Sequence, residues 1–272
     1  MSDFLRQGLS KVEAYVPGEQ PPGEAQFIKL NTNENPYPPS PVVEHAVRHF
    51  DACSLRLYPD PVCTELRTQA ARVYRVSPEQ ILVGNGSDEV LALIMRIAID
   101  PGDRVVYPYP TYVLYRTLAQ IAGAEPVEVE LEEDFSLPPD FPAQAGRVTF
   151  LACPNSPTAN LFRPELIEAT LDEAKGLVVV DEAYADFIGV SMLDRLERYG
   201  NLVVLRTLSK SYGLAGLRVG FAFANRNLIE ALYRVKDSYN VSRFSQVVAR
   251  AALSDAGYMK ATVAPVSYTH LT

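Results

Sequence analysis

Short apolar runs alternate with amphipathic segments through most of this 272-residue chain. Runs rich in Val, Ile and Leu are typical of strands that are buried on both faces of a sheet. We expect strands at 81–83, 104–107, 126–130, 148–152, 177–180, 202–205 and 219–224. We expect helices at 42–53, 60–75, 87–99, 111–122, 164–174, 226–235 and 243–253. This alternation predicts an α/β fold in three αβα layers, with a mostly parallel seven-stranded sheet between helices.

The two ends of the chain do not follow this pattern. Segments 15–24 and 28–41 are rich in Pro, Gly and Asn, so we expect an extended arm and a surface loop there. Residues 266–272 (VSYTHLT) have neither a helical period nor the composition of a natural terminus. We therefore expect that the natural chain continues and that residues 265–272 are a non-native or truncated tail.

Composition excludes several classes of function. The net charge of −8 without a basic run argues against nucleic-acid binding. No apolar run reaches the roughly 18 residues of a membrane span, and the N-terminus lacks a secretory signal, so we expect a cytoplasmic protein. Cys53, Cys63 and Cys153 form no CxxC pair and are expected to be reduced. His45 and His49 lack a third ligand, so we expect no metal site.

A glycine-rich turn, 84–86, follows the first expected strand and opens a helix at Ser87 and Asp88. Ligands of open parallel sheets bind beyond the carboxyl ends of the strands, and N–H groups at a helix start suit a phosphate. The turn matches neither GxGxxG nor a Walker loop, and ordinary helix capping is the alternative interpretation. The absence of the GxGxxG fingerprint disfavours a nicotinamide-dependent oxidoreductase.

Four further side chains follow expected strands. The amine of Lys210 can form an imine with a carbonyl cofactor, although a solvated loop lysine is the common alternative. Asp181 ends an apolar strand, and a buried carboxylate needs a cation such as a protonated ring nitrogen. Tyr112 can stack on a planar ring or belong to the core. Two prolines hold the backbone around Asn155, which is also compatible with a plain turn.

Hydroxyl groups of Thr207 and Ser209 and the guanidinium of Arg218 flank the same lysine and can hold a phosphate. An amine, a carboxylate, a flat aromatic ring and a phosphate cradle, all at strand ends of one sheet, are the requirements of pyridoxal 5′-phosphate. Lys210 would then also serve as the general base that moves a proton.

Nine blocks resemble, in order and spacing, the histidinol-phosphate aminotransferase family of fold-type I pyridoxal-phosphate enzymes, within the class II aminotransferases. The blocks lie within residues 10–264: YVPGEQ (15–20), LNTNENPYPPS (30–40), YPDP (58–61), GNGSDE (84–89), YPTY (109–112), CPNSPT (153–158), VVVDEAYADF (178–187), RTLSKSYGLAGLRVG (206–220) and YNVSRFSQ (239–246). The resemblance implies an aspartate-aminotransferase-like major domain. It divides the chain into an arm with part of a small domain (1–40), a large cofactor-binding domain (41–264) and the tail (265–272).

The resemblance also implies roles for matching residues around the cofactor ring. Lys210 would hold the carbonyl carbon of the cofactor, and Asp181 would pair with the pyridine nitrogen. Tyr184 and Asn155 would hold the phenolic oxygen, and Tyr112 would stack on the ring.

Other matching residues would hold the phosphate and the substrate. Five of them would bind the phosphate: Ser87, Asp88, Thr207, Ser209 and Arg218. Tyr58 would reach the phosphate in the neighbouring subunit, which implies a homodimer. Tyr15 and Asn35 would form a lid over the substrate, and Asn240 would lie near the entrance.

The implied reaction is reversible amino transfer in histidine biosynthesis. Histidinol phosphate and 2-oxoglutarate would become imidazole-acetol phosphate and glutamate. The alternatives are an aromatic or broad aminotransferase, a threonine-phosphate decarboxylase-like enzyme, or an inactive fragment that binds cofactor.

Two departures from the family pattern bear on these roles. Ser156 and Ala159 stand where the family more often has Asn and Gly, and we expect the turn to survive. No arginine matches those that bind substrate in the small C-terminal domain, which we expect to be largely missing.

Overall fold

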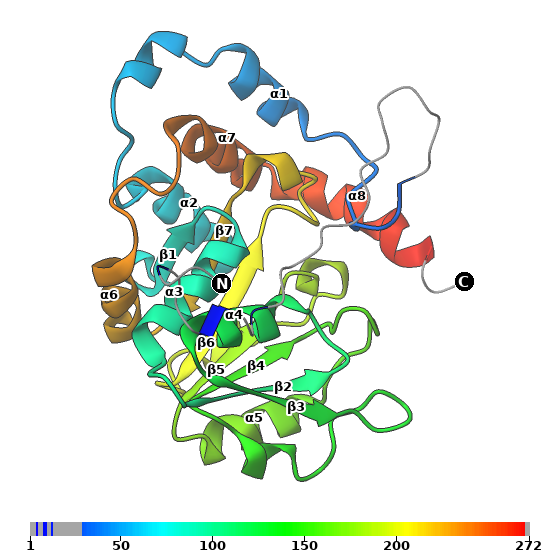
Figure 1. The fold of residues 1–272 in the computed structure, drawn as a ribbon. Helices are drawn as coiled ribbons and strands as arrows, with labels where there is room; N and C mark the ends of the chain where they lie inside the picture. The colour runs from blue at the N-terminus through cyan, green and yellow to red at the C-terminus, as the bar shows by residue number, and fades with distance from the viewer. Residues whose placement is uncertain (1–3, 5–7, 10–11, 13–28, 270–272) are drawn as a thin grey trace.

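Seven strands form one sheet in the order β1-β7-β6-β5-β4-β2-β3 in the computed structural model, which describes residues 4, 8–9, 12 and 29–269 (Figure 1). The strands are β1 (Ile81–Gly84), β2 (Arg104–Tyr109), β3 (Glu125–Glu130), β4 (Val148–Ala152), β5 (Leu177–Asp181), β6 (Leu202–Thr207) and β7 (Gly220–Ala224). Only β7 runs antiparallel to its neighbours, β1 and β6. The predicted mostly parallel, seven-stranded sheet is confirmed.

Helices cover both faces of this sheet. The helices are α1 (Pro41–Arg48), α2 (Thr64–Tyr74), α3 (Ser87–Ala98), α4 (Leu114–Ala122), α5 (Pro164–Glu173), α6 (Arg226–Val235), α7 (Arg243–Ser254) and α8 (Ala256–Thr269). Buried side chains of α3, α4 and α6 pack on one face, and those of α2, α5, α7 and α8 pack on the other. These layers account for the αβα order that the sequence predicts.

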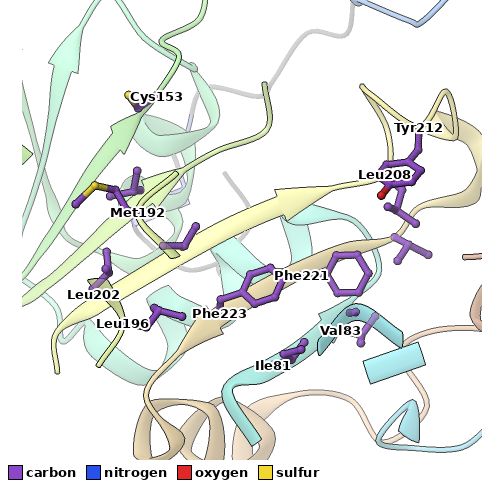
Figure 2. Packing of buried hydrophobic residues seen from close by; sticks show 14 of the residues in the cluster. Ile81, Val83, Cys153, Met192, Leu196, Leu202, Leu208, Tyr212, Phe221 and Phe223 are labelled. Carbon is purple, nitrogen blue, oxygen red and sulfur yellow. The ribbon is translucent and has the colours of Figure 1, made fainter. Parts of the chain in front are cut away.

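Alternate residues of each strand enter opposite layers of the core. In β1, Leu82 packs with α3 and α4, whereas Ile81 and Val83 face the other layer. Figure 2 shows Ile81 and Val83 beside Phe221 and Phe223 of β7, as the strand register requires. Burial of these side chains on both faces explains why the strands are continuous apolar runs.

The expected helix 111–122 begins only at Leu114. Two other helices end or begin away from their expected positions because aspartates bind the backbone. The expected helix 42–53 ends at Arg48, and Asp51 accepts a hydrogen bond from the Cys53 amide to start a separate 3-10 turn. Asp60 accepts from the amides of Val62 and Thr64, so α2 begins at Thr64 instead of at position 60. Such side-chain turns compete with a helix at its first residues.

Residues 266–269 are helical although the sequence there shows no helical period, and the non-native or truncated tail at 265–272 stays a prediction. Helix α8 continues to Thr269 and includes Pro265. Met259 and Val263 are buried four residues apart, and the Ser267 hydroxyl donates to the Phe187 carbonyl oxygen at 2.9 Å. These contacts place one face of α8 against the core layer formed with the sheet. The rest of the tail, 270–272, lies outside the described residues.

The segment from Lys29 to Ser40 contains no helix or strand, in agreement with the loop expected at 28–41. The arm expected at 15–24 lies outside the described residues. Within the described part of the chain, no helix has the length and apolar character needed to cross a membrane. The same residues contain no group of three or more potential metal ligands.

Candidate active site

Most of the expected site residues lie at the carboxyl ends of β1, β2, β4, β5 and β6. The register across β6, β7 and β1 aligns Thr207 with Gly220 and Gly220 with Gly84. The end of β6 therefore lies level with the turn that opens α3. The carboxyl ends of parallel strands are the usual ligand-binding edge of such sheets.

The turn into α3 brings together three of the residues expected around a phosphate (Ser87, Asp88 and Arg218) with Tyr112, which is expected on the ring. Arg218 Nη2 lies 3.0 Å from Asp88 Oδ2, and the Tyr112 hydroxyl donates to Asp88 Oδ1 at 3.2 Å. Ser87 is the first residue of α3, and its backbone nitrogen lies 2.4 Å from the place that a Cβ on Gly220 would occupy. The missing Cβ atom lets β7 lie directly against the start of the helix.

Gly86 leaves a second space at this helix start. Its φ of 84° is left-handed, and a Cβ there would lie 2.5 Å from Arg218 Nη2. The guanidinium can therefore approach the α3 N-terminus only because residue 86 is glycine. N–H groups at a helix start together with a nearby guanidinium are a combination that suits a phosphate.

Thr207 and Ser209 complete this part of the site from β6. The Thr207 hydroxyl donates to Ser209 Oγ at 3.0 Å and accepts from the Ser209 amide at 3.1 Å. Both side chains are buried. The structure therefore fixes the two hydroxyl groups relative to each other.

Asp181, the last residue of β5, is 6% exposed and carries no ion pair with any described residue. Its Oδ2 accepts from the Tyr115 hydroxyl at 2.9 Å, and its Oδ1 accepts from the Ala183 amide at 3.1 Å. Burial raises the pKa of Asp181, and these two donors lower it by less. The carboxylate thus remains open to a cationic partner.

Asn155, 1% exposed, lies in the turn after β4 with its amide held in one orientation. Its Oδ1 accepts from the Thr111 hydroxyl at 2.6 Å, and its Nδ2 donates to the Pro110 carbonyl oxygen at 2.9 Å and to Thr158 Oγ1 at 2.7 Å. The fixed amide expected from the flanking prolines is present. To donate to a ligand, Nδ2 must exchange one of these contacts.

Lys210 and Tyr184 face each other beneath the segment 29–40. Lys210 Nζ lies 5.4 Å from the centre of the Tyr184 ring and donates to the Thr32 carbonyl oxygen at 2.8 Å. The Tyr184 hydroxyl accepts from Asn33 Nδ2 at 3.0 Å. Asn35 Nδ2 donates to the Lys210 carbonyl oxygen at 3.3 Å. The Lys210 amine is therefore close to the Tyr184 ring, and Asn35 contacts the backbone of Lys210.

Tyr58 and Asn240 lie away from the amine. Tyr58 is 75% exposed and stacks on Tyr239 with ring centres 4.4 Å apart, at the wall of a groove of about 570 Å³ that Arg218 also lines. Asn240 Nδ2 donates to Glu89 Oε2 at 2.7 Å, and thereby supports the turn into α3. The remaining expected substrate residue, Tyr15, lies outside the described residues.

Sequence reasoning missed Tyr115 and a buried ionic group around Arg206. Tyr115 donates a hydrogen bond directly to Asp181. In the sequence it lies in the helix after the YPTY segment, where nothing distinguishes it from a core tyrosine. Arg206 pairs with Glu182 and Asp186. The sequence signal was an arginine at the end of an apolar strand, where an unpaired charge is costly.

The chain itself fits pyridoxal 5′-phosphate in three respects. The buried Asp181 carboxylate has no ion-pair partner among the described residues, a glycine at position 86 leaves space beside Arg218, and the Lys210 amine lies beside a tyrosine. These three features match, in order, the ring nitrogen, the phosphate and the carbonyl carbon of that cofactor.

Comparison with known proteins agrees with this geometry. The model of the family "Aminotransferase class I and II" matches residues 25–266. Histidinol-phosphate aminotransferase 1 of Trichormus variabilis is 45% identical over all of this chain and 79% of its own length. Histidinol-phosphate aminotransferase of Geotalea uraniireducens is 45% identical over 97% of this chain and 76% of its own length.

Solved structures of similar fold extend the comparison. The Sinorhizobium meliloti histidinol-phosphate aminotransferase, in complex with pyridoxal-5′-phosphate, is 28% identical with a TM-score of 0.78, covering 85% of this chain. This chain spans 65% of the length of that structure. A Thermus thermophilus aspartate aminotransferase mutant, 21% identical with a TM-score of 0.82, shares the fold.

Proposed function

Because the chain belongs to the aminotransferase class I and II family, we propose that it transaminates L-histidinol phosphate with 2-oxoglutarate, using pyridoxal 5′-phosphate. The products would be imidazole-acetol phosphate and glutamate, as a step of histidine biosynthesis. The family resemblance and the aspartate-aminotransferase-like fold expected from the sequence are confirmed. Since the chain spans 65% of the structure solved with cofactor, the substrates and partners of the whole enzyme are part of the proposal.

The single observation that carries the proposal is the pair formed by Asp181 and Lys210. Asp181 is the last residue of β5, and Lys210 follows the end of the adjacent strand β6. Asp181 pairs with Leu205 of β6. Asp181 is buried without an ion-pair partner among the described residues, and Lys210 is half-buried at the same sheet edge. This adjacency supports the proposed roles of the Asp181 carboxylate at the ring nitrogen and of the Lys210 amine at the carbonyl carbon.

When bound, pyridoxal phosphate supplies a reactive carbonyl carbon and a ring that withdraws electrons from a substrate's α-carbon. Asp181 would keep a proton on the ring nitrogen, since a buried carboxylate is stabilised by an adjacent positive charge. The Tyr184 hydroxyl and the Asn155 amide would donate to the phenolic oxygen. Tyr112, which is half-buried beside Asp88, would lie on the ring face.

Lys210 would perform two steps in turn. Its amine would hold the carbonyl carbon of the cofactor and, once free, would act as the general base that moves the 1,3 proton from the substrate's α-carbon. Lys210 now donates to the Thr32 carbonyl oxygen, so this contact must break before the amine reacts.

Phosphate binding would use the α3 turn and the end of β6. Backbone N–H groups of Ser87 and Asp88, hydroxyl groups of Thr207 and Ser209 and the guanidinium of Arg218 would surround it. In this arrangement Arg218 would exchange part of its contact with Asp88 for the phosphate.

The subunit arrangement is also proposed. Exposed Tyr58 would reach the phosphate of a second subunit in a homodimer, which would leave each subunit with an incomplete site. Asn35 would lie over the substrate, and Asn240 would act from the entrance. A cytoplasmic location stays a prediction.

The test combines cofactor binding with substrate choice. We expect the purified protein to give the visible absorbance band of a lysine-bound pyridoxal group, and borohydride reduction to mark Lys210 in a peptide mass spectrum. Lys210→Ala should lose the band and all transamination. Lys175→Ala, an exposed lysine of the αβ loop before β5, should keep both.

Substrate choice separates this function from its rivals. L-histidinol phosphate should be converted with 2-oxoglutarate, with release of glutamate. Absence of the band in the wild type would contradict the cofactor assignment. Faster conversion of phenylalanine or aspartate than of histidinol phosphate would contradict the substrate assignment.

A further inference from the structure

One buried arginine joins the two chain segments that carry Asp181 and Lys210. Arg206, in β6, is 6% exposed. Its Nη2 lies 2.8 Å from Glu182 Oε2, and its Nη1 lies 2.6 Å from Asp186 Oδ1. The guanidinium also lies over the Tyr74 ring, 5.6 Å from its centre. Arg206 therefore uses both ends of its planar group on two different carboxylates.

Both carboxylates lead directly to the proposed reacting residues. Glu182 follows Asp181 in the chain. Asp186 Oδ2 accepts from the Ser211 hydroxyl at 2.5 Å, and Ser211 follows Lys210. The path from Asp181 to Lys210 thus contains two peptide bonds, two ion pairs and one hydrogen bond.

Glu182 is fixed on its other side as well. The Met192 amide donates to its Oε1 at 2.5 Å, and the Ser191 hydroxyl donates to its Oε2 at 2.7 Å. Burial raises the pKa of Glu182, while Arg206 and these donors lower it by less. Glu182 is 2% exposed, so it can move little without breaking several contacts.

Stability alone does not explain this group. Three charges are removed from water, and a buried ion pair contributes no more than well-packed apolar residues of the same volume. Two carboxylates share one guanidinium, and the Nε of Arg206 has no hydrogen-bond partner among the described residues. Both carboxylates are therefore paired, whereas Arg206 itself is left with an unpaired Nε. This points to a role for Arg206 in holding the two carboxylates in position.

We propose that Arg206 is a positioning residue that holds the Asp181 carboxylate and the Lys210 amine in register, through Glu182 on one side and through Asp186 and Ser211 on the other. This inference rests on the proposed function. Misplacement of a reacting group by about 1 Å can lower a rate by roughly a hundredfold. Arg206 touches neither reacting residue, so its effect must pass through the two segments.

Three variants test the proposal. Arg206→Met should lower kcat by about ten- to a hundredfold with little change in KM, because binding groups stay in place. Arg206→Lys keeps the charge but cannot bind two carboxylates through a planar group, so it should recover only part of kcat. Arg195→Met, which removes the partly buried surface ion pair with Glu168, is the matched control and should keep the wild-type kcat.

A triple variant keeps the test meaningful if Arg206→Met folds poorly. Glu182→Gln, Asp186→Asn and Arg206→Met together leave no unpaired buried charge, and should restore the urea midpoint of the apoprotein relative to Arg206→Met alone. Its kcat should stay low. A triple variant that recovers stability and wild-type kcat together would overturn the positioning role.

A readout without cofactor separates the two proposals. The rate of Lys210 acetylation by acetic anhydride at one fixed pH, followed by peptide mass, reports the surroundings of the amine in the apoprotein. The rate should change in Arg206→Met and stay unchanged in Arg195→Met. An unchanged rate and an unchanged kcat in Arg206→Met would overturn the inference. If the wild type gives no cofactor band but the rate still changes in Arg206→Met, the link between Arg206 and Lys210 is supported and the proposed function is defeated.

Discussion

Asp181 makes the stability of the folded chain depend on pH in the direction opposite to that of a carboxylate held in an ion pair. Burial raises its pKa above the usual value, and the Tyr115 hydroxyl and the Ala183 amide lower it by less. Between the unfolded and the folded pKa, the folded state therefore binds more protons than the unfolded state. Stability contributed by this group is present at low pH and is lost as pH rises through that window.

Replacing Asp181 by Asn should stabilise the apoprotein at neutral pH while it destroys cofactor binding. Asparagine removes the buried charge and can still accept from the Tyr115 hydroxyl, although it loses the bond from the Ala183 amide. Because the buried charge costs more than that one hydrogen bond, the unfolding temperature at pH 7 should rise by a few degrees. The gain should shrink as pH falls toward 4. Cofactor affinity should fall by at least about a hundredfold, since the cation at the ring nitrogen loses its partner. Thermal unfolding from pH 4 to 8, with cofactor titrations, measures both effects.

Asp194→Asn is the control for this substitution because Asp194 forms an exposed ion pair with Arg195. It should change neither the unfolding temperature at pH 7 nor the affinity for cofactor by a measurable amount. An Asp181→Asn apoprotein that is less stable than the wild type at pH 7 would show that the carboxylate is already compensated in the empty site.

At the scale of single elements, the start of α3 depends on the absence of a side chain at position 86. Gly86→Ala should weaken cofactor binding by about tenfold, because the new Cβ meets the Arg218 guanidinium at 2.5 Å and the left-handed φ of 84° is strained. Inorganic phosphate should compete less well against cofactor in this variant. The expected loss of stability is about 1 kcal/mol.

Gly102→Ala separates backbone strain from steric contact. Gly102 has a φ of 92°, yet nothing lies within 4 Å of a Cβ at that position. This control should lose about the same stability and keep the wild-type affinity for cofactor and phosphate. Equal losses of affinity in the two variants would mean that Arg218 is not the group displaced.

The elements that could be predicted from sequence are those with a local cause. Strands such as β4 (Val148–Ala152) were located because both faces are buried, which makes the sequence continuously apolar. Helix α1 begins where Ser40 caps it and Pro41 follows, as the pattern indicates. In contrast, α8 extends to Thr269 because of contacts with the core layer formed with the sheet, and no local pattern records them.

The same distinction applies to the site. Lys210 and Asp181 follow strands, and chemistry alone identifies what such residues need. Tyr115 and Arg206 act through partners far apart in sequence, so their roles become visible only when the strands are aligned.

At the scale of the whole molecule, the N-terminal segment and the sheet edge form one unit around the amine. Asn33 donates to the Tyr184 hydroxyl, Asn35 donates to the carbonyl oxygen of Ser211, and Lys210 donates to that of Thr32. Residues more than 150 positions apart are thus held together across the reacting group. Motion of this segment would therefore both release the amine and open the site.

We expect a second subunit to supply Tyr58 to the phosphate site of the first. Tyr58 is exposed on a groove that Arg218 also lines, and we place its hydroxyl at the phosphate of the partner in a two-fold dimer. Tyr58→Phe and Lys210→Ala should each be nearly inactive as pure dimers. A mixed dimer, however, contains one site with Lys210 from the first subunit and Tyr58 from the second, and that site is native.

Unfolding the two variants together, refolding them in equal amounts and assaying transamination tests this arrangement. Random pairing gives about half mixed dimers with one native site in two, so activity should reach about a quarter of the wild-type value. Mixing without unfolding, before subunits exchange, should give no recovery. If activity does not recover after complete exchange, in a sample that light scattering shows to be dimeric, each subunit builds its site from its own residues. Tyr58 would then serve only to stack on Tyr239.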